Sequence, residues 1–318
     1  MMKKIGALLA VTALALSGCA QTDREYPSKK IELIVAFGAG STNDVVARAF
    51  AASFEDVSGG TVLVLNRPGA MGIIGTTEAS LTADDGYTML LAPVAAFTNA
   101  PLLQETHYSS EDFKSVTSLS SQGFAITVRA DSPYNSLDDL KNADSALTYA
   151  TLGEGHSGHV LLAEILKDLG KDGRAIPFDG AANAIQSTIS GETDIAVTDA
   201  SAAYQREKSG EVKVLAVTGD ERIPSMPDVP TVTEEGYPEA NYLATQALAI
   251  PAGVDDETTQ KITELAEKAV HSDSYQEYLK TANSTLQDID GPKWMTDYVP
   301  EEKARIEQAY QELGIGQR

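Results

Sequence analysis

The 318-residue chain contains a single cysteine, Cys19, and therefore cannot form a disulfide within itself. Basic residues are also scarce: 24 lysines and arginines stand against 46 aspartates and glutamates, which gives a formal net charge of -22. A chain with this balance and no basic stripe is not expected to bind nucleic acid. The acidic excess does not attract an anion over long distances either, so donors at short range would have to hold an anionic ligand.

Long hydrophobic runs are missing as well. The apolar run at 5–16 follows two lysines and is too short to span a bilayer, which takes about 20 residues. A short basic stretch before such a run is typical of a secretory signal peptide. Leu16-Ser17-Gly18-Cys19 resembles a bacterial lipobox, so we expect a lipoprotein signal peptide at 1–18, lipid on Cys19 and a tether at 19–30. The alternative is an incidental cysteine at an ordinary cleavage site.

Beyond the tether, short apolar runs alternate with helical patterns. Ile31–Phe37 is predicted to be a buried strand, and Asn43–Glu55 places its apolar residues on one face of a helix. Such alternation predicts an α/β fold with parallel strand–helix–strand units. The strands are predicted at 31–37, 61–65, 87–91, 123–129, 146–150, 175–178, 194–198, 212–218 and 247–250. The helices are predicted at 43–55, 73–81, 137–141, 160–169, 182–189, 257–271 and 292–313, the last kinked or split at Pro300.

A glycine-containing loop, Gly38-Ala39-Gly40-Ser41-Thr42-Asn43, joins the first strand to the first helix. Its N–H groups and the positive end of the helix converge on one spot, which favours an anion. Ser41 and Asp44 have the spacing of a capping box. Asp44 could act as a general base, but a carboxylate in the first turn of a helix is more often a cap. We predict that this loop holds a carboxylate and that a second loop closes on it.

The second loop, Gly153-Glu154-Gly155-His156-Ser157-Gly158, is a G-x-G-x-x-G sequence between a predicted strand and a predicted helix. This is the context of the dinucleotide fingerprint, with Asp179 as a weak candidate for the ribose-binding acid. Export of the chain weighs against a nicotinamide cofactor, and so does the missing third glycine in the first loop. The remaining interpretation is a loop and helix N-terminus that bind some other anion.

Metal binding and catalysis find little support in the side chains. His156 and His159 are three apart at a helix start and could form a metal pair, but His107 and His271 add no matching spacing. One histidine that hydrogen-bonds while the other caps or packs is the more common arrangement. Asp199 follows a strand end, where it either lines a cleft or is an ordinary turn residue, and both readings stay open.

Successive blocks of the chain resemble the solute-binding receptors of tripartite tricarboxylate transporters, the Bug-type periplasmic receptors. Gly40–Arg48 is similar to the family's glycine-glycine-x-x-aspartate helix start. Asn66-Arg67-Pro68-Gly69-Ala70 is similar to its asparagine-arginine-proline-glycine loop. The other blocks, in family order, are 26–37, 85–88, 155–159, 177–180, 215–219 and 227–231.

The resemblance implies an α/β, two-lobed periplasmic binding protein of type II, a Venus-flytrap fold with two mostly parallel or mixed sheets flanked by helices. Lobe 1 would be discontinuous, made of 31–122 plus 247–318, and lobe 2 would be 123–246. The chain would cross between them near Gly123–Arg129 and Tyr242–Ile250. A carboxylate would lie between the lobes, which close by hinge motion.

The resemblance also implies a set of ligand-binding residues. These are Gly40, Ser41, Thr42, Asn43 and Asp44 on one side, Gly155, His156, Ser157 and His159 on the other, then Phe178, Gly180 and Ala181, with Asp199 near the pocket floor. Departures from the family pattern concern ligand identity. Ser41 replaces a glycine, His156 replaces a small hydroxyl residue, Gln246 replaces a frequent aromatic, and Gly38-Ala39 replaces prolines.

The function predicted is that of an extracytoplasmic, lipid-anchored receptor. It would capture a citrate-like tricarboxylate, a dicarboxylate or a related organic acid and deliver it to the large and small integral membrane components of the transporter. We expect a monomer without catalytic residues, metal or cofactor, and thus not an enzyme. The alternatives are an exported nucleotide-binding enzyme that uses the Gly153–Gly158 loop, and a carboxylate sensor subunit.

Overall fold

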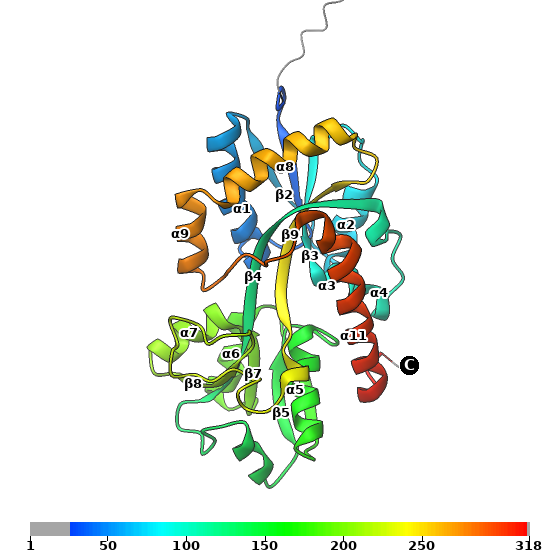
Figure 1. Cartoon of the computed structure of the whole chain (residues 1–318). Helices are drawn as coiled ribbons and strands as arrows, with labels where there is room; N and C mark the ends of the chain where they lie inside the picture. The colour runs from blue at the N-terminus through cyan, green and yellow to red at the C-terminus, as the bar shows by residue number, and fades with distance from the viewer. Residues whose placement is uncertain (1–25, 317–318) are drawn as a thin grey trace, which may run out of the picture.

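Two long strands, β4 (Phe113–Arg129) and β9 (Leu243–Pro251), connect two α/β lobes (Figure 1). The computed structural model describes residues 26–316. The predicted signal peptide at 1–18, Cys19 and the first part of the tether lie outside the described residues. Among the helices within 26–316, none is long and apolar enough to cross a membrane.

A nine-stranded sheet runs through both lobes. In the first lobe β1, β2 and β3 are parallel, and β9 is antiparallel to β3 and to β4. In the second lobe β5, β6 and β7 are parallel, while β7 and β8 are antiparallel to β4. The other strands are β1 (Ile31–Val35), β2 (Val62–Asn66), β3 (Thr88–Pro93), β5 (Leu147–Thr151), β6 (Gly173–Pro177), β7 (Ile195–Asp199) and β8 (Val212–Val217). The predicted α/β fold with mixed sheets and flanking helices is confirmed.

Strand β4 changes partners between the lobes. Residues 113–123 pair with β9, and residues from Phe124 onward pair with β7 and β8. The strand begins at Phe113, not at Gly123 as predicted, because its first half is rich in serine and gave no apolar pattern. Ser115 and Ser118 are nevertheless buried, and both hydrogen-bond to the segment 287–295.

Helices cover both faces of the first-lobe half of the sheet. Because side chains alternate along a strand, Leu33 packs with helices α1 and α8, whereas Ile34 packs with Trp294 on the opposite face. Helices α1 (Thr42–Ser58), α8 (Asp256–Val270) and α9 (Asp273–Thr281) belong to the first face. Helices α2 (Ile73–Ser80), α3 (Val94–Phe97) and α4 (Ala100–Leu103), with α10 (Gly291–Lys293) and a π-helical turn at Trp294–Tyr298, belong to the second.

The second-lobe half of the sheet is covered in the same way. Helix α5 (Ser157–Asp168) packs on one face with Ile126 and Val197, and helices α6 (Ala181–Ser190) and α7 (Ala200–Lys208) pack on the other. Helix α7 was not predicted, because it buries only two alanines and shows no apolar stripe. Helix α9 was not predicted either.

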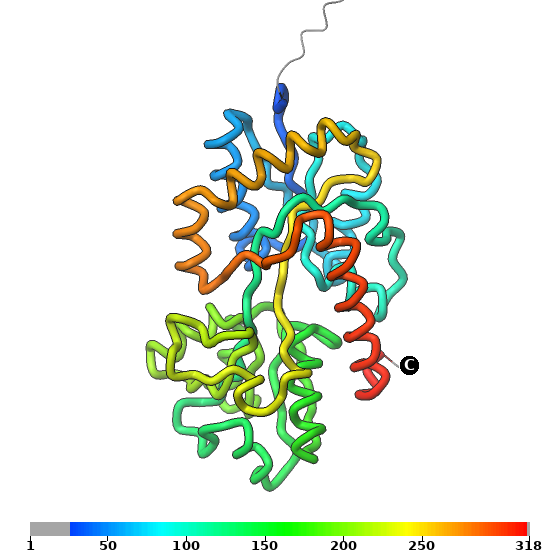
Figure 2. The backbone as a smooth tube through the Cα atoms, in the orientation of Figure 1, coloured from blue at the N-terminus to red at the C-terminus, as the bar shows by residue number. Residues whose placement is uncertain are grey.

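The last helix, α11 (Val299–Leu313), spans both lobes (Figure 2). Val299 packs with Trp294 of the first lobe, while Ile306 and Tyr310 lie in the core cluster of the second lobe. Pro300 stands in the first turn, directly after the π-helical turn, so the predicted break is confirmed. The predicted division assigned 247–318 to lobe 1. That boundary stays a prediction, and α11 joins the lobes a third time.

Candidate ligand-binding site

Helix N-termini gather where the lobes meet. The parallel strands β5, β6 and β7 end at the same edge of the sheet and lead into α5, α6 and α7. At the end of β7, the carboxylate of Asp199 accepts a hydrogen bond from the hydroxyl of Thr42, at 2.8 Å, in the first turn of α1. This bond crosses between the lobes, so the edge faces α1. Such an arrangement directs unpaired N–H groups of several helices toward one region.

The first loop is fixed around Asp44, which is 4% exposed. Its carboxylate accepts hydrogen bonds from the N–H of Gly40 at 2.9 Å, from Nε of Arg48 at 3.0 Å and from Nδ2 of Asn66 at 2.9 Å. Burial alone would raise the pKa of Asp44, but these hydrogen bonds outweigh it and hold the pKa below its usual value. Asp44 therefore positions the loop through partners of its own lobe.

The predicted capping box is half formed. The hydroxyl of Ser41 accepts the N–H of Asp44 at 3.3 Å, but the carboxylate of Asp44 accepts the N–H of Gly40 instead of that of Ser41. Gly40 has a φ of +80°, a conformation that glycine adopts without strain. The N–H groups of Thr42 and Asn43 have no acceptor among the described residues. These two N–H groups are the donors that the first turn of α1 leaves available.

Asp199 has no cationic partner within residues 26–316. Although it is the N-cap residue of α7, its side chain does not cap that helix. Burial raises the pKa of Asp199, and the hydroxyl of Thr42 opposes this shift only in part. The structure thus places a half-buried carboxylate without a countercharge beside the first turn of α1.

His156 is the N-cap of α5. Its Nδ1 accepts the N–H of Gly158 at 3.2 Å, which leaves the ring proton on Nε2. The ring lies edge-on to Phe124, with centroids 5.5 Å apart. Burial, and to a lesser degree His159, lower the pKa of His156 to about 4, so the ring is neutral near pH 7. It can offer one N–H donor and no charge.

Ser157 opens helix α5 and is buried. Neither its backbone N–H nor its hydroxyl has a partner among the described residues. Ala181 likewise has an unpaired N–H in the first turn of α6, next to Gly180 and to Phe178, whose own N–H donates to the carbonyl of Thr151 at 2.8 Å. These donors complement those of α1.

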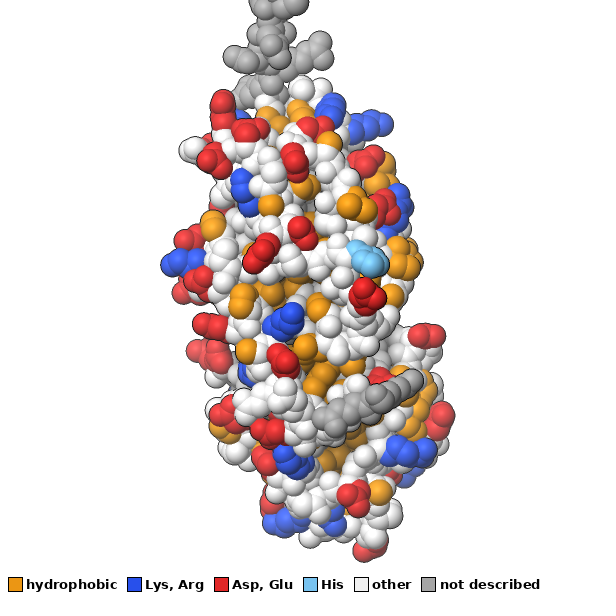
Figure 3. Space-filling view, turned by 90° about the vertical axis from the view of Figure 1, so that its right-hand side faces the viewer, with side chains coloured by type: hydrophobic (Ala, Val, Ile, Leu, Met, Phe, Trp, Pro, Cys, Tyr) orange, Lys and Arg blue, Asp and Glu red, His pale blue; other side chains and the backbone are white. Residues whose placement is uncertain are grey.

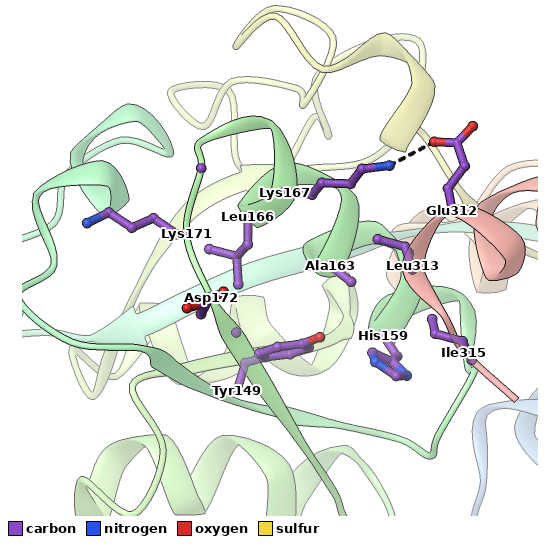
Figure 4. A pocket seen from close by; sticks show the side chains of 12 residues that line it. Tyr149, His159, Ala163, Leu166, Lys167, Lys171, Asp172, Glu312, Leu313 and Ile315 are labelled. Atoms are coloured by element: carbon purple, nitrogen blue, oxygen red, sulfur yellow. Dashed lines mark hydrogen bonds and ion pairs between the residues drawn. The ribbon is translucent and has the colours of Figure 1, made fainter. Parts of the chain in front are cut away.

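His159 faces a different part of the molecule. Its Nδ1 accepts the N–H of Gly155 at 2.9 Å, and its ring lies near that of Tyr149. It lines a cavity of about 480 Å³ between α5 and the end of α11, beside the ion pair of Lys167 and Glu312 (Figure 4). No other residue of the predicted site lines this cavity. His159 therefore supports the second loop from behind.

Gly155 ties the second loop to the rest of the chain. Its carbonyl accepts hydrogen bonds from Nδ2 of Asn99, at 2.8 Å, and from the hydroxyl of Tyr310. A Cβ here would lie 2.5 Å from the Tyr310 oxygen and 2.6 Å from Leu103, and φ is +70°, so only glycine fits. Asn99 and Tyr310 were not predicted, because nothing in their local sequence distinguishes them from ordinary packing residues.

Two buried glutamines on the connecting strands were also not predicted to be site residues. Gln122 on β4 and Gln246 on β9 are each 3% exposed. Their Oε1 atoms, and Oδ1 of Asn43, are buried and have no hydrogen-bond partner within residues 26–316. In the sequence, Gln246 stands out only as a departure from the family pattern. Gln122 carries one signal in the sequence: it is a long polar residue at the end of a serine-rich stretch, directly before Gly123.

The remaining site alternatives lose support from this geometry. In the described part of the chain no group of three or more metal-ligating side chains occurs, and Nδ1 of both His156 and His159 accepts a backbone N–H. The same bonds occupy the N–H groups of Gly155 and Gly158, which a dinucleotide phosphate would need. On the face shown in Figure 3, acidic and basic side chains are interspersed over the described residues without a continuous basic patch.

Two α/β lobes, connecting strands between them and helix N-termini at their junction define a two-lobed periplasmic binding protein. Residues 46–315 match the model of the tripartite tricarboxylate transporter family receptor, and the chain belongs to this family. As a member of a family of periplasmic solute-binding receptors, it acts outside the cytoplasm.

Relatives and solved structures agree with this assignment. An Agrobacterium vitis protein from the ttuE-ttuC' intergenic region is 33% identical over 82% of this chain and 77% of its own length. The periplasmic binding protein BugD has a TM-score of 0.78 and 26% identity, over 91% of this chain and 99% of that one. A TctC solute-binding protein from Polaromonas has a TM-score of 0.75 and 29% identity, over 90% and 99%. The fold is also that of MatC from Rhodopseudomonas palustris, solved with malate, at a TM-score of 0.77 and 24% identity, over 89% and 99%.

Proposed function

We propose that this receptor captures a small organic carboxylate between its lobes and delivers it to the membrane components of a tripartite tricarboxylate transporter. The observation that carries the proposal is the set of unpaired N–H groups on Thr42, Asn43 and Ser157, which belong to helix N-termini of both lobes. Helix N-termini bind carboxylates without a full countercharge. The malate seen in MatC is consistent with a carboxylate in this fold.

Each predicted site residue takes a defined role in this proposal. Thr42, Asn43, His156, Ser157 and Ala181 supply donors to the ligand. Gly40, Ser41, Asp44, Gly155 and His159 shape the two loops, Phe178 and Gly180 flank the third donor, and Asp199 lines the floor. The lobes 31–122 plus 247–318 and 123–246 would move about β4 and β9. Nothing in this scheme requires catalysis, a cofactor or a metal ion.

We further infer that the chain is held at the membrane as a monomer by lipid on Cys19. The lipobox-like sequence before the only cysteine supports this. Changing Cys19→Ser should move the protein from the membrane fraction to the soluble fraction and abolish its labelling by a clickable fatty acid. If the Cys19→Ser variant loses its labelling but stays in the membrane fraction, lipid on Cys19 is not what anchors the chain.

A thermal-shift screen of the chain without its predicted signal peptide tests the receptor function. The panel holds propionate, succinate, malate, adipate, citrate, aspartate and glutamate, with ATP and NAD for comparison. Binding raises the free energy of unfolding by mass action, by about 2.7 kcal/mol at a ligand concentration of about a hundred times Kd. We expect at least one carboxylate to raise the melting temperature in a concentration-dependent way. Stabilisation by a nucleotide alone would favour the enzyme alternative.

A further inference from the structure

We propose that the bound acid carries a protonated amino group, so that this receptor takes an amino acid rather than an unsubstituted carboxylic acid. The inference rests on the proposed function and narrows its substrate class. It is carried by three buried amide oxygens that have no donor among the described residues and by the Asp199 carboxylate, whose donor is the neutral hydroxyl of Thr42. This acceptor cluster consists of Oδ1 of Asn43, Oε1 of Gln122, Oε1 of Gln246 and the carboxylate of Asp199.

The two glutamines are neighbours on the connecting strands. Gln246 of β9 is paired with Ser120 of β4, so both side chains lie on the same face of the sheet. Nε2 of Gln122 donates to Oγ of Ser120 at 3.5 Å, which brings Gln122 to that face too. Both glutamines are more than nine-tenths buried, and an unpaired buried amide oxygen is costly. Buried polar groups in proteins are nearly always hydrogen-bonded, so these amide oxygens need a donor.

A chain of hydroxyls determines which end of the Gln122 amide is unpaired. The carbonyl of Ser121 can only accept, so the hydroxyl of Ser284 donates to it, at 3.0 Å. Oγ of Ser284 therefore accepts from the hydroxyl of Ser120, at 2.7 Å, and Ser120 in turn accepts from Gln122. The amide nitrogen of Gln122 is thus used within the protein. Its oxygen remains, and that oxygen can only accept.

Asn43 lies at the same end of the first lobe. On α1 it is three and four residues before Val46 and Ala47, whose side chains share one core cluster with Leu248 of β9. Gln246 precedes Leu248 by two residues, on the same face of the strand and nearer the lobe junction. Both residues therefore lie at the junction end of this cluster, and their oxygens are buried without partners in the described part of the chain.

Asp199 adds a negative charge to these neutral acceptors. Its neighbour Thr42 adjoins Asn43, and its partner in the β4–β7 pairing is Phe124, two residues beyond Gln122. Arg48 of helix α1 supplies no countercharge, because it is already paired with Asp44 at 2.9 Å. A ligand with only carboxylate groups would thus bring more negative charge next to an uncompensated one.

An ammonium group satisfies this cluster better than the alternatives. It has three N–H donors for the amide oxygens and a positive charge for Asp199. A ligand hydroxyl offers one donor and leaves Asp199 without a countercharge. The carboxylate of the same ligand would bind the N–H groups of Thr42, Asn43 and Ser157. The donors on the helix N-termini and the acceptor cluster together complement the two ends of a zwitterion.

Matched ligand pairs test the proposal by isothermal titration calorimetry: glutamate against glutarate, aspartate against succinate, and alanine against propionate. Because hydrogen bonds with charged groups contribute about 1.5–3 kcal/mol, the amino member of at least one pair should bind about ten to a hundred times more tightly. Equal or tighter binding of the unsubstituted acid in every pair that binds would overturn this inference but leave the carboxylate receptor standing. Binding of no acid at all would overturn the receptor function itself.

Asp199→Asn provides the residue-level test, since asparagine keeps the size and can still accept from Thr42. Affinity for the amino ligand should fall about tenfold or more, while affinity for its unsubstituted partner stays the same or rises. A purely structural role of Asp199 would weaken both ligands equally, and that result would contradict the proposal. Asp228→Asn removes the same charge from an exposed loop and should change neither affinity.

Discussion

The two glycine loops near the lobe junction have the same build and are held in different ways. The first loop is anchored by the carboxylate of Asp44, whose partners all belong to the first lobe. The second is capped by two neutral imidazoles, and its Gly155 carbonyl is bound by Asn99 of the first lobe and by Tyr310 of α11. The first loop therefore keeps its anchor if the lobes move apart and loses only the bond from Thr42 to Asp199. The second must exchange partners if the lobes move apart.

Filling the junction should have the largest effect of any change in either loop. Ser157→Trp places a large side chain where α5 offers its unpaired N–H, and we expect ligand binding to be abolished while the far-ultraviolet circular dichroism spectrum is retained. Ser157→Ala, which removes only the hydroxyl, serves as the control and should weaken binding by less than about tenfold. Unimpaired affinity in the tryptophan variant would show that the second loop does not face the ligand.

Removing the anchor of each loop compares the two modes of support directly. Asp44→Ala deletes an acceptor that serves Gly40, Arg48 and Asn66 and should lower the free energy of unfolding by about 2–3 kcal/mol. His159→Ala removes one neutral hydrogen bond and should cost about 1 kcal/mol. Urea denaturation of both variants measures the difference. Equal losses would mean that the charge on Asp44 adds nothing to the first loop.

Tyr310→Phe examines the attachment of the second loop to α11. The change removes one of the two donors to the Gly155 carbonyl and should cost about 1 kcal/mol of stability. Asn99→Ala removes the other donor. Because both share one acceptor, the double variant should depart from additivity by about 0.5 kcal/mol or more in a double-mutant cycle. Strict additivity would argue against a shared acceptor.

The carboxylates of the two lobes should respond to pH in opposite directions. The pKa of Asp44 is lowered in the folded chain, so its contribution to stability is present above the unfolded pKa, about 3.9, and is lost as the pH falls through the folded value. The pKa of Asp199 is raised, so its charged form destabilises the fold, and this penalty disappears at low pH. Asp199→Asn should therefore raise the melting temperature by a few degrees at pH 7 and much less at pH 4. Asp44→Asn should lower the melting temperature at pH 7.

Gln246→Leu should have the smallest effect on stability. The stability should rise, whereas the affinity for the ligand should fall. Leucine fills a similar volume and removes a buried amide oxygen without a partner, so stability should rise by up to about 1 kcal/mol. Affinity for an amino ligand should fall in the same variant. A loss of stability would indicate that the amide of Gln246 has a structural partner in solution.

Much of the fold could be predicted because it depends on local pattern. The strand at Ile31–Val35 and the helix that follows Ser41 show apolar periodicity and a cap residue, and both elements appear with small shifts at their ends. The first half of β4 and helix α7 could not be predicted. The first half of β4 is rich in serine and α7 buries only two alanines, so neither shows an apolar period, and packing against distant segments stabilises both.

The residues of the candidate site divide in the same way, into those with a local sequence signal and those without one. Gly40, Asp44 and Gly155 carry signals that lie within a few residues of sequence, because loop geometry and capping are local. The bond between Thr42 and Asp199 joins residues far apart in the chain, and so does the contact of Asn99 with Gly155. The placement of His159 behind its loop depends on Tyr149 and the end of α11.

Local patterns in the sequence are enough to predict the class of fold, the two anion-favouring loops and the family, because hydrophobic period, caps and glycine turns act over a few residues. Only the tertiary structure decided which donors and acceptors remain unpaired at the lobe junction. That outcome depends on every partner available in three dimensions: Arg48 and Asn66 satisfy Asp44, whereas nothing among the described residues neutralises Asp199. The ligand's second functional group could be inferred only from that difference.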